Sequence, residues 1–123
     1  MAAAIALTVI LALLAVFQLA LALGSPLGRF AWGGAHRVLP TGLRIGSLVS
    51  IVVYTVIAVL ALDRVDVIDV VPDAVSAVGM WIVFGYFVLG IVMNAISRSK
   101  PERYTMTPVV AVLAVLSLLV ALS

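Results

Sequence analysis

Residues Ala3–Leu23 read AAIALTVILALLAVFQLALAL, and this apolar run decides the fold. Its only polar side chains are those of Thr8 and Gln18. A helix needs about 20 residues to cross the roughly 30 Å of hydrocarbon in a bilayer, at a rise of about 1.5 Å per residue. Three further runs have the same character: Leu43–Leu62, Val75–Ser97 and Met106–Leu122. The sequence therefore predicts four transmembrane helices.

The composition of the 123-residue chain agrees with this prediction. Hydrophobic residues make up 66% of the chain and charged residues only 10%, whereas soluble proteins carry about 25% charged residues. Only helices and closed barrels satisfy their backbone hydrogen bonds within a membrane, and barrel strands alternate polar and apolar residues. These runs do not alternate. We therefore predict an all-α fold, a four-helix transmembrane bundle in which residues 1–123 form a single membrane domain.

The charges between the runs predict how the bundle is oriented. Six of the seven basic residues fall in or beside the first and third gaps, namely Arg29, Arg37, Arg44, Arg98, Lys100 and Arg103. The second gap instead contains Asp63, Asp66, Asp69 and Asp73, with Arg64. Lys and Arg collect in cytoplasmic loops, so we expect gaps one and three in the cytoplasm and both termini outside the cell membrane. The basic charge thus reflects membrane topology, and we expect no nucleic-acid partner.

A few polar residues lie within the runs near their cytoplasmic ends. From the rise per residue, Gln18, Ser47, Ser50 and Asn94 all fall within about 10 Å of one membrane level. We therefore predict that they converge in a polar cluster in the cytoplasmic leaflet. Two interpretations stay open. The cluster either forms hydrogen bonds between helices, usually worth under about 2 kcal/mol each, or lines a pocket that faces the cytoplasm.

The basic residues beside this level define what such a pocket would bind. The candidates for binding an anion or an anionic lipid headgroup are Arg29, His36, Arg37, Arg44 and Arg98. Arginine forks and glycine-rich backbone N–H groups both suit phosphate and carboxylate groups. The gap Gly24–Gly42 contains several glycines and prolines but also Phe30 and Trp32, which we expect to anchor it at the membrane interface. A shallow re-entrant loop is the alternative.

The sequence offers little for catalysis. There is no cysteine, and His36 is the only histidine, without the further ligands that a metal site needs. We predict no catalytic residue, no metal and no cofactor, and favour a protein that is not an enzyme. Asp and Glu are absent from all four runs, which argues against proton-coupled export. Tyr54 and Tyr86 lie near mid-span, where we expect them to be packing residues.

Two segments carry a resemblance: Ala31-Trp32-Gly33-Gly34-Ala35-His36-Arg37-Val38-Leu39-Pro40 and Asn94-Ala95-Ile96-Ser97-Arg98-Ser99. The chain resembles an uncharacterised family of small four-span bacterial integral membrane proteins. The resemblance implies four spans and no particular activity. Our preferred function is that of an integral membrane protein that interacts with lipid or acts as an accessory subunit, as a homo-oligomer or with a membrane partner. The alternative is an oligomeric channel or transporter for a neutral or anionic solute.

Overall fold

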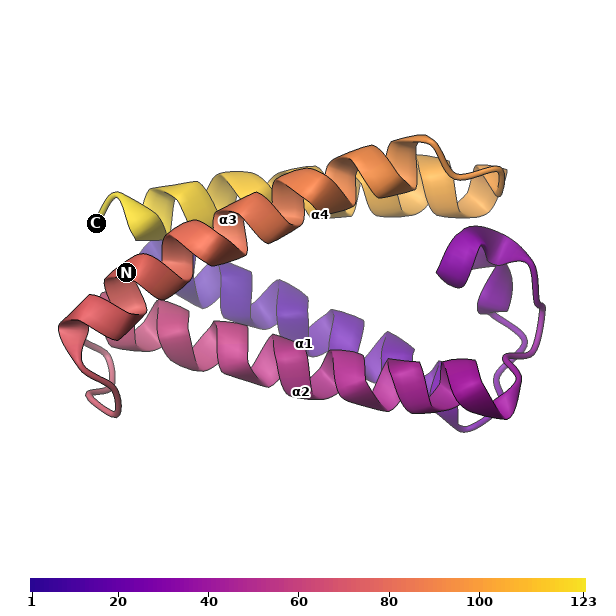
Figure 1. Cartoon of the computed structure of the whole chain (residues 1–123), viewed down its shortest axis with the longest axis horizontal. Coiled ribbons are helices and arrows are strands. Elements are labelled where there is room, and N and C mark those ends of the chain that lie inside the picture. Colours follow the sequence, from indigo (N-terminus) through magenta and orange to yellow (C-terminus); the bar gives the residue numbers. More distant parts are fainter.

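The computed structural model describes residues 1–123 as an antiparallel bundle of four long helices without strands (Figure 1). The elements are α1 (Ala2–Ala22), two 3-10 turns η1 (Gly28–Phe30) and η2 (Trp32–Gly34), α2 (Thr41–Arg64), α3 (Asp73–Ala95) and α4 (Lys100–Ala121). All four helices are long and apolar enough to cross a membrane. The predicted fold class is thus confirmed.

The two ends of the bundle carry different charges. Both termini lie at the end that contains the α2–α3 loop (Figure 1), which we call the acidic end because it carries Asp63, Asp66, Asp69 and Asp73. The opposite end contains η1, η2 and the α3–α4 connection. We call it the basic end because it carries Arg29, Arg37, Arg44, Arg98, Lys100 and Arg103.

The bundle consists of two helical hairpins that meet at the acidic end. Helix α1 packs mainly on α2 and α3 mainly on α4. The two hairpins approach each other near the termini and separate toward the basic end, where η1 and η2 lie against α4 (Figure 1). Their shared core consists of Ala4, Leu7, Leu11, Ile57, Ala61, Met80, Val83, Phe87, Leu113, Ala114, Val120 and Ala121. The apolar packing therefore concentrates in the half of the bundle nearer the acidic end.

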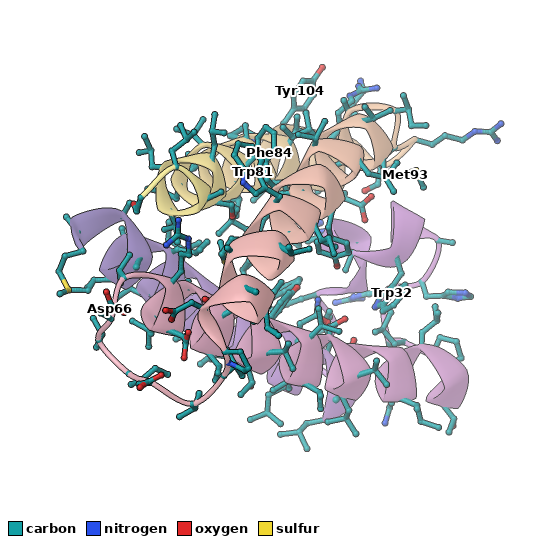
Figure 2. All side chains as sticks on the ribbon, turned by 60° about the vertical axis from the view of Figure 1, so that its left-hand side comes forward. Trp32, Asp66, Trp81, Phe84, Met93 and Tyr104 are labelled. Carbon is teal, nitrogen blue, oxygen red and sulfur yellow. The ribbon has the colours of Figure 1, made fainter.

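The outer surface of the helices is apolar as well. Only 22 of the 123 residues are buried, while large side chains such as Leu13, Val52 and Ile82 are more than 60% exposed. Figure 2 shows such side chains projecting around the whole bundle. A soluble monomer rarely exposes apolar surface on this scale. Lipid is the solvent that suits this surface, which makes the chain a multi-pass membrane protein.

Helix α4 begins earlier than the sequence prediction placed it. The hydroxyl oxygen of Ser99 accepts a hydrogen bond from the N–H of Glu102 at 3.5 Å, and Pro101 occupies the first turn. Ser at the N-cap with Glu three residues later is the sequence pattern of a capping box, which favours the start of a helix. Here the Glu102 side chain bonds to Gly33 instead of the Ser99 N–H. Residues 100–105, which the sequence prediction left between the third and fourth runs, are therefore helical, and Pro108 lies in the helix interior.

The α2–α3 loop at the acidic end is closed by one of its own carboxylates. Asp63 accepts hydrogen bonds from the backbone N–H groups of Val70 and Val71, at 2.8 and 3.1 Å. Its side chain is only 2% exposed. The two backbone N–H groups thus hold the Asp63 carboxylate inside the loop and away from the surface.

Candidate ligand cavity at the basic end

The separation of the hairpins leaves a cavity of about 580 Å³ in the basic half of the bundle. All four helices contribute to its wall, and residues 30–33 and Ser97 form the remaining part. Fourteen of its 21 lining residues are hydrophobic. Most of these lie deeper than the helix ends, and Phe87 and Leu113 also belong to the core. The cavity therefore has an apolar floor that continues into the packed half.

Glycines allow the segment Gly28–Gly34 to fold over the mouth of this cavity. The N–H of Gly28 donates to the Arg37 carbonyl oxygen at 2.8 Å, and a Cβ there would overlap the His36 carbonyl. Gly34 has a φ of +72°, and a Cβ on it would overlap the Ser99 side chain. Ser99 in turn donates a hydrogen bond to the Arg29 carbonyl oxygen. The segment is thus fixed against the start of α4 by contacts that only glycine permits.

Trp32 and Phe30 point into the bundle. The indole N–H of Trp32 donates to the Ser47 hydroxyl at 3.2 Å, and its ring lies against Gly46 of α2. Figure 2 shows Trp32 between the turn and α2. Both aromatic residues line the cavity. Trp32 thus packs on Gly46 and Ser47 of α2 while remaining 43% exposed, and the expectation that the two aromatic residues anchor the segment at the membrane interface stays a prediction.

A carboxylate lies in the cavity wall. Glu102, in the first turn of α4, is only 6% exposed, and its Oε2 accepts the N–H of Gly33 at 3.0 Å. The four apolar runs contain no Asp or Glu, as the sequence showed, but Glu102 is buried beside the last of them. Helix α4 begins six residues before the apolar run at Met106, which places Glu102 in its first turn. The expectation that the protein does not carry out proton-coupled export stays a prediction.

The structure brings three of the four predicted cluster residues to the cavity. Gln18, Ser50 and Asn94 all line it. Gln18 Nε2 donates to the Tyr54 hydroxyl at 3.3 Å, whereas its Oε1 is buried without a partner. Ser50 and Asn94 donate back to their own helices, to the carbonyl oxygens of Gly46 at 3.0 Å and Gly90 at 2.7 Å.

The fourth predicted residue, Ser47, is fully buried behind Trp32 and does not line the cavity. Tyr54 and Tyr86, which we expected to be packing residues, are both part of the wall. The depth of a residue along its helix therefore does not settle whether its side chain faces the cavity.

The basic residues lie outside the cavity and do not form one group. Arg29 and Arg37 line a separate pocket of about 260 Å³ together with Pro26 and Gly34. Arg44 donates from Nε to the Leu39 carbonyl oxygen at 2.8 Å, and its guanidinium lies against Gly24. His36 and Arg98 are exposed on the surface. A single anion site that uses all five predicted residues is therefore not assembled in this structure.

Comparisons with known proteins add no function to this geometry. No protein-family model, no curated protein and no solved structure matches the chain. The feature that points to a function is therefore the cavity itself, with its apolar floor, its buried carboxylate and the glycine-rich segment Gly28–Gly34 beside it.

Proposed function

We propose that the protein is a lipid-interacting membrane protein of the cell membrane that holds one amphipathic molecule between its two hairpins. The observation that carries this proposal is the cavity of about 580 Å³ in the basic half of the bundle. Its volume lies within the range of roughly 300–1,000 Å³ found for small-molecule sites. Its mainly apolar wall, with a few convergent polar groups, is also typical of such sites.

A space of this size needs an occupant. The cavity opens to the surface of the bundle, where solvent, lipid or another ligand can fill it. Water would fill a polar space but has few partners beside Phe87, Leu113 and the other apolar residues of the floor. An apolar group in the floor, with a polar group near Gln18 and Glu102, satisfies both parts of the wall.

The wall also supports entry from the lipid side. Tyr86, Leu89 and Met93 of α3 line the cavity and are 52%, 61% and 59% exposed. These side chains therefore border both the cavity and the outer surface of α3. In a bilayer that surface would face hydrocarbon, so an amphipathic molecule would reach the cavity without crossing water.

The proposed orientation places the basic end in the cytoplasm and both termini outside, because Lys and Arg collect on the cytoplasmic side. The chain contains no cysteine, so single cysteines report the orientation directly. In intact cells, a membrane-impermeant maleimide should label Asp69→Cys and spare His36→Cys. The opposite pattern would invert the orientation.

The cavity is tested by filling it. Ser50 faces the cavity, whereas the preceding Val49 is 55% exposed on the outside of α2. Ser50→Trp should therefore displace the bound molecule, and Val49→Trp should leave it in place. Native mass spectrometry of the detergent-purified protein gives the readout. We expect the same bound mass with wild type and V49W and its loss with S50W. Equal bound mass in S50W, or none in wild type, would reject the proposal.

Glu102 supports a second candidate, a transporter that uses this cavity and works as an oligomer. Carboxylates in membrane segments commonly mark ion and substrate pathways. A carboxylate in the wall is unfavourable for an anionic solute, so a cationic or neutral solute fits better than the anion we first considered. Solute flux in proteoliposomes that is abolished by Ser50→Trp but not by Val49→Trp would support transport.

A further inference from the structure

We propose that the molecule held in the cavity is an amphipathic organic cation, with its positive group beside Glu102 and its apolar part on the floor. This inference rests on the proposed function and specifies the ligand class. The observations that carry it are the absence of basic side chains from the wall, the buried carboxylate and the aromatic lining.

The wall contains no basic side chain, and several of its N–H groups already donate within the protein. Asn94 Nδ2 donates to the Gly90 carbonyl oxygen, Trp32 Nε1 to the Ser47 hydroxyl and the Gly33 N–H to Glu102. Gln18 Nε2 donates to the Tyr54 hydroxyl. No Lys, Arg or His lines the cavity. An anion such as a phosphate therefore finds no cationic side chain in the wall to pair with.

The acceptors, in contrast, are left open. Gln18 is 9% exposed, and its Oε1 is buried without any partner. Glu102 uses Oε2 for the Gly33 N–H, and its other carboxylate oxygen, which is not fully buried, accepts no hydrogen bond from the protein. A buried polar group costs free energy unless it is paired, and a buried charge costs more. The ligand that satisfies this wall donates hydrogen bonds and carries a positive charge.

Aromatic rings supply the rest of the recognition. Six of the nine aromatic residues of the chain line this cavity: Phe17, Phe30, Trp32, Tyr54, Tyr86 and Phe87. The faces of aromatic rings attract cations within about 6 Å, more strongly when the cation is desolvated. The same rings offer apolar surface to the body of the ligand. Val109, Val110 and Leu113 complete the apolar floor.

The test uses two probes of nearly equal shape and opposite charge. Tetraphenylphosphonium is a cation and tetraphenylborate an anion. Binding is measured by equilibrium dialysis against the protein in nanodiscs, and binding to empty nanodiscs is subtracted. We expect the cation to bind saturably and the anion to bind at least about tenfold more weakly, a difference of about 1.4 kcal/mol in binding free energy. Equal binding of the two probes, or tighter binding of the anion, would overturn the inference.

Substitutions then place the charge. Glu102→Gln removes the charge but keeps an oxygen that can accept the Gly33 N–H, so we expect it to remain folded and to bind the cation about tenfold more weakly. Asp66→Asn, at the acidic end, is the matched control and should bind as wild type. Unchanged binding by E102Q would overturn the assignment. If E102Q does not fold, Glu102→Asp takes its place, because it keeps the charge and should still prefer the cation.

Failure of this inference is distinguishable from failure of the proposed function. If S50W loses a bound molecule in native mass spectrometry while the two probes bind equally, the cavity holds a ligand that is not a cation. The inference then falls and the proposed function stands. If S50W binds both the endogenous molecule and the cation as wild type does, both proposals fall.

Discussion

The two halves of this bundle are built from the same four helices, yet one half is closely packed and the other surrounds a cavity. In the acidic half, small and large apolar residues such as Ala4, Leu7, Ala61 and Met80 fill the space between the hairpins. In the basic half, the hairpins separate, and a glycine-rich segment, several polar side chains and one carboxylate surround a cavity. The contrast teaches that close packing and the cavity lie at different ends of the same helices.

The largest expected effect concerns the packed half. Leu7 is fully buried in the core, whereas Leu14, two turns later on α1, borders the cavity. Leu7→Ala should cost about 2–5 kcal/mol of unfolding free energy, because a cavity forms where the surroundings are close-packed. Leu14→Ala should cost clearly less, since it enlarges a space that already exists. Reversible unfolding in mixed micelles measures both variants. Equal losses would remove the distinction between the halves.

The next effect concerns the cover of the cavity. Gly34→Ala combines a φ of +72° with an overlap on Ser99, so it should displace the segment Gly28–Gly34. Backbone strain of this kind costs about 1–3 kcal/mol. Gly33→Ala has a similar φ of +77° but meets nothing within 4 Å, and is the matched control with the smaller loss. Quenching of Trp32 fluorescence by acrylamide, in a Trp81→Phe background, should increase more in G34A than in G33A. The reverse order would contradict the packing account of this segment.

The smallest effect concerns the start of α4. Ser99→Ala removes the N-cap and the hydrogen bond to the Arg29 carbonyl oxygen. Loss of an N-cap serine costs about 1 kcal/mol. We expect hydrogen exchange to speed up in the first turn of α4 and in η1, and to stay unchanged in the α2–α3 loop. Faster exchange in that loop would show that the two ends are more strongly coupled than the structure indicates.

The sequence alone predicted the four-helix fold and the depth of several residues that line the cavity. Length and apolar composition predicted four helices, because a bilayer demands about 20 apolar residues per span. Depth along each helix placed Gln18, Ser50 and Asn94 at one level, and all three line the same cavity, although none bonds to another. Antiparallel helices of known rise make such depth arithmetic dependable.

What the sequence did not reveal depends on rotation and on local capping. Depth says nothing about which face a side chain occupies, so Ser47 could not be told apart from Ser50. Glu102 was assigned to a polar gap because hydropathy placed the start of the span at Met106. The Ser99-to-Glu102 capping box was the one signal that could have extended α4 and brought the carboxylate into the bundle.

The most direct measurement of the central claim compares methyl groups in the two halves by NMR. Leu113 and Leu7 are both almost fully buried, at 1% and 0% exposure, but only Leu113 lines the cavity. The amphiphile is protonated and the micelle otherwise deuterated. We predict intermolecular NOEs from the amphiphile to the Leu113 methyls and none to those of Leu7. In S50W the NOEs to Leu113 should disappear. Leu113 methyls that show NOEs only to α1 and α2 side chains would mean that the hairpins close along their full length, and would contradict the account.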